Sequence, residues 1–128
     1  TTHMQYKSYT IVGHGRGKSL GFPTLNLELK GDIAFSLPDG IYAAWAWVHD
    51  NKYPAALYIG PVPVFDQREK SLELYLLDVF NIYVGPGEDV AFEPVKHIRG
   101  VQNFSSPELL VLQMEKDVEA VRKALQLL

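Results

Sequence analysis

The sequence contains no cysteine, which excludes disulfide bonds and thiolate metal sites and fits a reducing compartment. It has no apolar run long enough to span a membrane and no recognisable signal peptide, so we expect a cytoplasmic protein without a membrane partner. An excess of basic residues is also missing. The net charge is −3 and the pI about 5.7, so no overall positive field would attract nucleic acid. Any site for a phosphorylated ligand must therefore be local.

What is present fits one globular domain. The chain has 128 residues, of which 47% are hydrophobic, enough for a sizeable core. Residues 1–4 contain a His-Met pair typical of a cloning remnant, so we assign the domain to residues 5–128. This assignment leaves open a longer parent protein.

Alternating and β-branched segments predict a mostly β protein. The expected strands are residues 6–12, 24–29, 41–48, 55–59, 71–78 and 90–97. Residues 41–48 are apolar on both faces, which predicts a strand covered by a barrel interior and by something packed outside. We expect residues 31–39 to be a loop, Asp50-Asn51 to be a hairpin turn, and Pro54 to place its strand at a sheet edge.

A helix is expected at the C-terminal end. Ser106, Pro107 and Glu108 supply a hydroxyl cap, a proline at the first position and an acid in the first turn. Apolar residues then recur at steps of three or four, namely Leu110, Met114, Val118, Val121, Leu125 and Leu128. This stripe predicts a helix packed against the outside of the sheet.

The most informative segment for function is residues 13–26, which reads Gly-His-Gly-Arg-Gly-Lys-Ser-Leu-Gly-Phe-Pro-Thr-Leu-Asn. Its alternating glycines let the backbone fold closely around phosphate oxygens, while His14 either approaches a phosphate or is solvated. Thr24 and Asn26 offer a hydroxyl and an amide oxygen, hard ligands of the kind Mg²⁺ prefers. The spacing is one residue short of a P-loop, and Lys18 stands where a dinucleotide-binding motif has its third glycine. From composition alone, a tight surface turn remains open.

Glu73 is the candidate catalytic carboxylate. Within Leu72–Leu76 it alternates with leucines, so it shares a face with Tyr75. Two interpretations remain open: an outward glutamate on a half-exposed strand, or a general base that accepts a proton from a substrate hydroxyl.

Three further polar residues, Arg99, His49 and His97, could bind a ligand or a metal. Arg99 lies in a loop before the expected helix, where it either reaches an anionic ligand or forms a salt bridge with a surface acid. His49 and His97 stand at strand ends without the spacing of a metal pair, so we expect no zinc site.

With these residues in place, the sequence resembles the riboflavin kinase family, the flavokinase domain found alone or fused to an FAD synthetase. The matching motifs run in family order over nearly the whole chain and include Gly13-His-Gly-Arg-Gly, Leu20-Gly-Phe-Pro-Thr-Leu-Asn, Asp39-Gly-Ile-Tyr42, Ile59-Gly60, Leu72-Glu-Leu-Tyr75, Ile98-Arg99 and Asn103-Phe104. Three features depart from the family pattern: Leu25 in place of the usual Ala, Tyr58 where an Asn is common, and an unusually apolar Pro61-Val62-Pro63-Val64.

The resemblance implies an all-β fold with a C-terminal helix, a six-stranded antiparallel Greek-key barrel. It also implies transfer of the ATP γ-phosphate to the 5′-hydroxyl of riboflavin, giving FMN, with Mg²⁺ as cofactor. Glu73 would be the catalytic base, and Thr24 and Asn26 the metal ligands. The nucleotide-binding residues would be Gly13, His14, Gly15, Arg16, Gly17, Lys18, Pro23, Thr24 and Asn26. The flavin-binding residues would be Ile98, Arg99, Val101 and Phe104.

Two other functions stay open at this stage. One is a non-catalytic flavin- or nucleotide-binding module, for which Tyr58 and Val62 are the motive. The other is a barrel that serves as an interaction platform in a larger enzyme. We expect no FAD synthetase activity from this chain, because the His-x-Gly-His motif of nucleotidylyl transfer is absent, although a parent protein could carry that domain.

Overall fold

A computed structural model describes residues 4–12, 24–61, 70–79 and 82–127. The strands are β1 (Tyr6–Tyr9), β2 (Leu25–Leu27), β3 (Gly40–Val48), β4 (Asn51–Pro61), β5 (Lys70–Leu76) and β6 (Asp89–Arg99). The helices are α2 (Gly31–Ser36) and α3 (Pro107–Ala124). Among these described residues, no helix has the length and apolar character that crossing a membrane requires.

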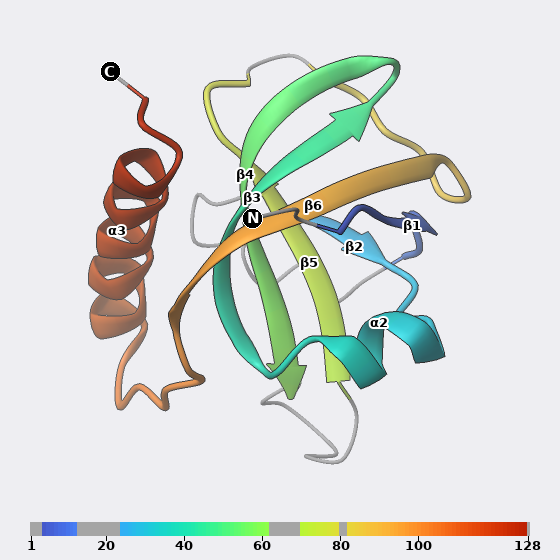
Figure 1. Ribbon diagram of the computed structural model, residues 1–128. Helices are drawn as coiled ribbons and strands as arrows, with labels where there is room; N and C mark the ends of the chain where they lie inside the picture. The colour runs from blue at the N-terminus through green and yellow to red at the C-terminus, as the bar shows by residue number, and fades with distance from the viewer. Residues whose placement is uncertain (1–3, 13–23, 62–69, 80–81, 128) are drawn as a thin grey trace.

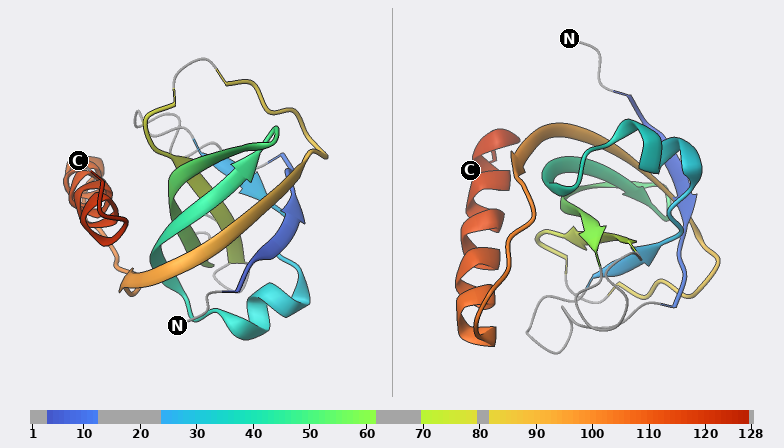
Figure 2. Two further views of the ribbon diagram at one scale, coloured as in Figure 1. Left: turned by 45° about the horizontal axis from the view of Figure 1, so that its top comes forward. Right: turned by 90° about the horizontal axis from the view of Figure 1, so that it is seen from below.

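The six strands form one antiparallel sheet in the order β1-β6-β3-β4-β5-β2 (Figure 1). β3, β4 and β5 are successive neighbours, and β6 returns after a longer connection to lie beside β3, which is a Greek-key arrangement. The two outermost strands meet at a bridge between Thr10 and Leu27, supported by a bond from Ile11 N to Asn26 O of 2.8 Å. The sheet is therefore a nearly closed barrel (Figure 2), and the predicted fold class is confirmed.

The barrel interior is filled by the inward-facing residues of each strand. Leu57 on β4 and Leu72 and Leu74 on β5 are at most 1% exposed. Tyr6 stacks on Phe92 inside the barrel, with ring centroids 5.6 Å apart. Burying a side chain of this size stabilises the fold by roughly 1.5–3 kcal/mol. The alternate residues of the same strands face outward, which is where polar site residues can lie.

β3 is buried on both faces, as predicted. Ala44 and Ala46 belong to the cluster inside the barrel, whereas Ala43 belongs to a second cluster with Val121 and Leu125 of α3. The helix therefore covers the outer face of the sheet, and Figures 1 and 2 show it lying alongside the barrel.

The start and the packing face of α3 agree with the sequence. The Ser106 hydroxyl accepts a bond from Leu109 N at 3.3 Å, and Pro107 is the first helical residue. Val118, Val121 and Leu125 of the predicted apolar stripe pack in the outer cluster. Leu128, the last residue of the stripe, lies outside the described residues.

Two predictions about the connections were wrong. Residues 31–39, expected as a loop, contain α2, whose Ile33 is completely buried in the core. The hairpin between β3 and β4 turns at His49 and Asp50, one residue earlier than the predicted Asp50-Asn51 pair. Both turn residues have positive φ, 50° and 64°, as a two-residue type I′ hairpin requires.

The position of Pro54 is a third correction. Its strand β4 is not an edge strand, because β3 and β5 flank it on either side and Pro54 pairs with Trp45. The ladder between β4 and β5 stops at Ala55 opposite Leu76, and the Pro54 carbonyl accepts a bond from Leu77 just beyond it. The missing N–H of Pro54 thus falls where the ladder has ended, so the proline breaks no regular pairing.

Candidate active site

Glu73 lies on the outer face of the barrel, in the middle of β5. Its neighbours Leu72 and Leu74 are 1% and 0% exposed in the interior, so the alternation of the strand turns Glu73 outward, where it is half-buried. Glu73 and Tyr75 therefore share the face opposite the leucines, as the sequence predicted.

Both expected metal ligands are neighbours of Glu73. Asn26 on β2 stands directly opposite Glu73 on β5, and directly opposed residues of antiparallel strands share a face. The Thr24 hydroxyl donates to Glu73 Oε1 at 3.2 Å. Leu25, which lies between the two ligands and departs from the family pattern, packs against the barrel core and points away from them.

Ser71 is a site residue that the sequence analysis missed. It precedes Glu73 by two residues on the same face of β5 and donates its hydroxyl to Glu73 Oε2 at 2.8 Å. Each oxygen of the carboxylate thus accepts a hydroxyl bond, one from Thr24 and one from Ser71. The period of two that predicted the orientation of Glu73 was the signal that could have found Ser71. We call Thr24, Asn26, Ser71 and Glu73 the Glu73 cluster.

The glycine-rich segment lies outside the described residues. This applies to Gly13, His14, Gly15, Arg16, Gly17, Lys18 and Pro23. The chain on either side is described, and the Ile11 N to Asn26 O bond shows that its two ends come together. The segment therefore connects neighbouring strands and ends at Thr24, within the Glu73 cluster.

The residues expected to contact flavin lie at the end of β6 and in the following loop. Ile98 is half-buried in the outer cluster that α3 covers. Val101 approaches β4: its Cγ2 is 3.0 Å from the point where a Cβ on Gly60 would stand. Because Gly60 pairs with Ser71, Val101 reaches the same side of the sheet as the Glu73 cluster. Phe104 is half-buried in the loop before α3.

Arg99 is bound to α3. Its Nε and Nη2 donate to the two carboxylate oxygens of Asp117, each at 2.8 Å, and its Nη1 donates to Gly100 O at 2.9 Å. Asp117 is 4% exposed and also accepts a bond from Gln113 at 2.9 Å. Such a bidentate pair is among the stronger polar contacts in proteins. The salt bridge considered for Arg99 is thus present, but with a buried acid rather than a surface acid.

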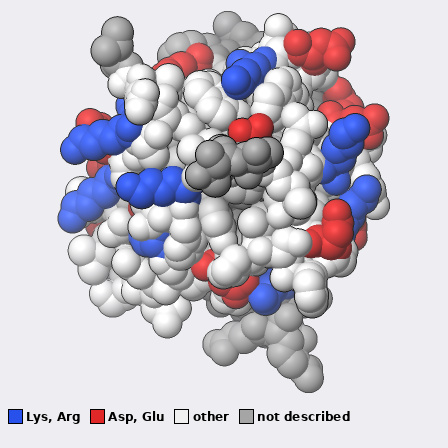
Figure 3. Space-filling view, in the orientation of Figure 1, with Lys and Arg blue, Asp and Glu red and all other residues white. Residues whose placement is uncertain are grey.

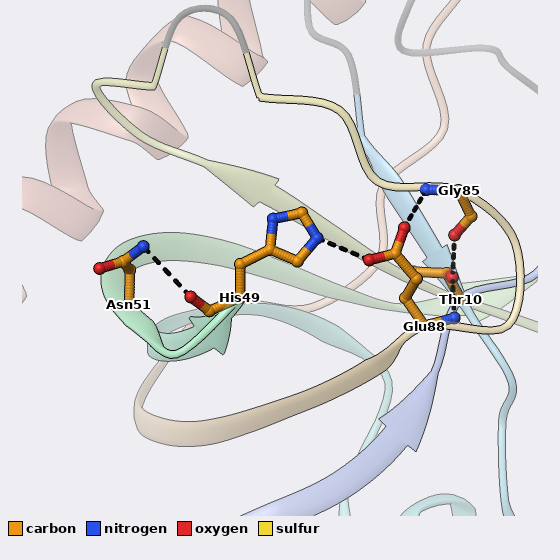
Figure 4. A network of polar contacts seen from close by, with 5 residues as sticks. All are labelled: Thr10, His49, Asn51, Gly85 and Glu88. Atoms are coloured by element: carbon orange, nitrogen blue, oxygen red, sulfur yellow. Dashed lines mark hydrogen bonds and ion pairs between the residues drawn. The ribbon is translucent and has the colours of Figure 1, made fainter.

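His49 belongs to a network that holds the loop before β6 (Figure 4). Its Nε2 is 2.6 Å from Glu88 Oε1, and Glu88 Oε2 accepts a bond from Gly85 N. The hydrogen bond with His49 and then that with the Gly85 amide lower the pKa of Glu88. Thr10 donates to Gly85 O at 2.6 Å and accepts from Glu88 N at 2.9 Å. The network joins Thr10 just after β1, the β3–β4 hairpin and this loop.

In the stretches of chain that the structure describes, no three His, Cys, Asp or Glu side chains gather in a way that could hold an ion.

Comparisons with known proteins identify the family. A family model for riboflavin kinase, the flavokinase domain, matches residues 1–125, and the chain belongs to this family. It is 38% identical over 123 residues to a bifunctional riboflavin kinase/FMN phosphatase of Arabidopsis thaliana, which covers 91% of this chain and 32% of the relative. It is 30% identical to a riboflavin kinase of Homo sapiens, over 98% of this chain and 84% of the relative.

A solved structure supports the same assignment. The crystal structure of riboflavin kinase from Trypanosoma brucei matches with a TM-score of 0.65 and 25% identity, over 95% of this chain and 80% of that chain. The chain spans about a third of the plant relative's length and most of the trypanosomal protein's.

Proposed function

We propose that this chain is a riboflavin kinase, which transfers the γ-phosphate of ATP to the 5′-hydroxyl of riboflavin and releases FMN and ADP. Its membership of the family supports the reaction. The observation that carries it within this molecule is the hydrogen bond between Thr24 and Glu73, because it joins the expected metal ligand to the expected base at 3.2 Å.

Glu73 is the base in this proposal. The ribityl oxygen attacks the γ-phosphorus, the bond from that phosphorus to the β–γ bridging oxygen breaks, and the hydroxyl proton passes to the Glu73 carboxylate. A carboxylate on the open face of β5 can be reached by a substrate hydroxyl, which a carboxylate inside the barrel could not. Most of the remaining catalysis is positioning of the two substrates.

The residues beside Glu73 suit Mg²⁺. Thr24 and Asn26 carry neutral oxygen ligands, and Mg²⁺ in kinases is commonly held by few protein groups together with water and substrate phosphates. These two residues would hold the ion, which would neutralise charge on the phosphates when bound. Basic and acidic side chains lie beside one another along the face in Figure 3, which fits a phosphate site made locally by residues 13–18 and Pro23.

Riboflavin is assigned to the outer face between the Glu73 cluster and residues 98–104. Val101 would contact the flavin directly, together with Ile98 and Phe104. Arg99 would contribute by holding this segment on α3, because each of its three guanidinium nitrogens donates a bond within the protein. Riboflavin and ATP are thus the proposed partners. A cytoplasmic location and the lack of a nucleic-acid partner stay predictions.

The test is a direct assay for FMN. The chain is incubated with riboflavin, ATP and MgCl₂, and FMN is separated from riboflavin by chromatography. We expect FMN formation that EDTA abolishes, and a loss of about 10²–10⁴-fold in kcat for Glu73→Gln, the usual contribution of a general base. Glu93→Gln, on β6, which β3 and β4 separate from β5 in the sheet, is the matched control and should keep full activity.

The possible results separate the candidate functions. Tight flavin binding without FMN would support the non-catalytic module, and absence of both would support the interaction platform. Full activity in Glu73→Gln would remove this residue from the role of base.

A further inference from the structure

Glu73 is oriented by neutral hydroxyl groups. Ser71 donates to Oε2 at 2.8 Å and Thr24 donates to Oε1 at 3.2 Å. The ion pairs that Lys70, Arg99 and Arg122 form in the described part of the chain all use other carboxylates, those of Asp39, Asp117 and Asp78. The carboxylate is therefore held without being neutralised by any of these cations.

The surroundings of Ser71 favour this single use of its hydroxyl. Ser71 is half-buried on the outer face, and its partner across the ladder is Gly60, which has no side chain to pack against it. The space above Gly60 is taken by Tyr58, whose hydroxyl lies 2.5 Å from where a Cβ of residue 60 would stand. Tyr58 in turn is the direct neighbour of Glu73 across β4 and β5. The serine thus stands beside the base on the same face of the sheet.

We propose that Ser71 is a positioning residue for Glu73 in the phosphoryl transfer, an inference that rests on the proposed kinase function. A carboxylate with one hydroxyl bond can still rotate about its last torsion, which is broad and roughly two-fold. With one bond to each oxygen, one from Ser71 on β5 and one from Thr24 just before β2, the plane of the carboxylate is fixed. Each oxygen has two lone pairs, so one on each remains for the substrate hydroxyl.

The expected kinetic effect falls on kcat. Misplacing a reacting group by about 1 Å can cost about 10²-fold in rate. Ser71→Ala should therefore lower kcat by about 10–100-fold and change the KM for ATP and for riboflavin by less than about threefold. Ser71→Thr keeps an Oγ on a residue that strands favour, so it should restore kcat to within about threefold of the parent.

A double-variant comparison separates positioning from general damage. In the Glu73→Gln background, Ser71→Ala should have little further effect on kcat, because residues that act as a unit are strongly non-additive. Thermal melting of each variant is measured alongside, and Ser71→Ala should melt within about 2 °C of the parent because a half-exposed serine contributes little to stability. Ser36→Ala, at the exposed end of α2, is the control serine and should leave kcat unchanged.

Each result decides between the two proposals. If the parent chain makes FMN and Glu73→Gln does not, a Ser71→Ala variant with parental kcat overturns the positioning role alone. The same follows if Ser71→Ala lowers kcat equally in both backgrounds, or if Ser71→Thr folds normally yet fails to restore activity. A parent chain that makes no FMN overturns the kinase function, and the role of Ser71 with it.

Discussion

At Gly40, the absence of a side chain lets the end of β6 lie directly against the start of β3. A Cβ at this position would stand 2.2 Å from Arg99 O and 2.4 Å from His97 Nε2, and the backbone has φ of +144°. Gly40→Ala should therefore lower the free energy of unfolding by about 3 kcal/mol, through overlap and backbone strain together. Urea unfolding measures this change.

Gly31 offers the matched control for that measurement. It is the first residue of α2, and nothing lies within 4 Å of the place a Cβ would take. Gly31→Ala should leave stability unchanged or raise it by up to about 1 kcal/mol, since alanine is the better helix former. Equal losses at the two glycines would contradict the close approach described for Gly40.

The sequence could predict the orientation of some side chains but not the bonding partners of others. The alternation with leucines predicted that Glu73 shares a face with Tyr75 opposite them, and the same rule, applied one step further, would have included Ser71. Periodicity could not predict that Arg99 donates its hydrogen bonds to Asp117. Asp117 is 18 residues away on a different element, and only the packing of α3 brings the two together.

At the level of elements, the ion pair between Arg99 and Asp117 fixes α3 to the end of β6. The pair is nearly buried, with side-chain exposures of 14% and 6%. Arg99→Met would leave the Asp117 carboxylate buried without its cation, which typically costs about 3–5 kcal/mol. The loss should be visible as a lower urea midpoint.

An exposed pair on the same helix is the control for this prediction. Arg122 pairs with Asp78 at 2.5 Å, with side-chain exposures of 31% and 56%. Because water screens such a pair, Arg122→Met should lower the urea midpoint far less than Arg99→Met does. A larger effect at Arg122 than at Arg99 would show that burial does not govern the contribution of these pairs.

The elements that the sequence predicted best are those with a long, regular pattern. The stripe of α3 and the two-sided burial of β3 were both visible, because each repeats over several turns or residue pairs. α2 was missed because six residues with one buried side chain, Ile33, are too short to show a helical period. The prediction of an edge strand from Pro54 was wrong for a different reason. A proline is tolerated where a hydrogen-bonded ladder ends inside a sheet as well as on an edge strand.

At the scale of the whole molecule, the shifted pKa values of Asp78, Glu88 and Tyr42 predict how the free energy of unfolding changes with pH. Hydrogen bonds, from Arg122 to Asp78 and between His49 and Glu88, lower the pKa of both carboxyls. Burial raises the pKa of Tyr42, and the nearby Asp39 adds to the effect.

The sign of each contribution follows from the direction of its shift. A lowered carboxyl pKa stabilises the fold above the unfolded value, and this stability is lost as pH falls below about 4.5. The raised pKa of Tyr42 gives stability that is complete below about pH 10 and is lost at higher pH. The urea concentration at the unfolding midpoint should therefore stay constant between about pH 4.5 and about pH 10 and decrease outside this range.

A variant can assign the acid side of that profile. Glu88→Gln should make the decline below about pH 4.5 shallower, because one group with a lowered pKa has been removed. Glu115→Gln, on the exposed side of α3, is the control and should reproduce the parental profile. An acid limb of equal slope in the parent and in Glu88→Gln would contradict the contribution assigned to Glu88.

The order of strands in the barrel lies beyond what local patterns contain. Alternation indicates that β3 and β6 are strands, but their pairing joins residues about fifty positions apart and is set by the packing of the whole sheet. The Greek-key order was expected only from the family resemblance, and the structure confirms it.

The contact between Thr10 and Leu27 has a consequence for how such barrels diversify. Because the chain after β1 and strand β2 adjoin there, the described residues on either side of 13–23 lie close together. Lengthening a loop whose two ends already lie together costs little free energy of folding, because the entropic cost of loop closure grows only with the logarithm of the loop length. Evolution or engineering could thus exchange this insert, which the proposed function assigns to nucleotide binding, without moving any strand of the scaffold that supports it.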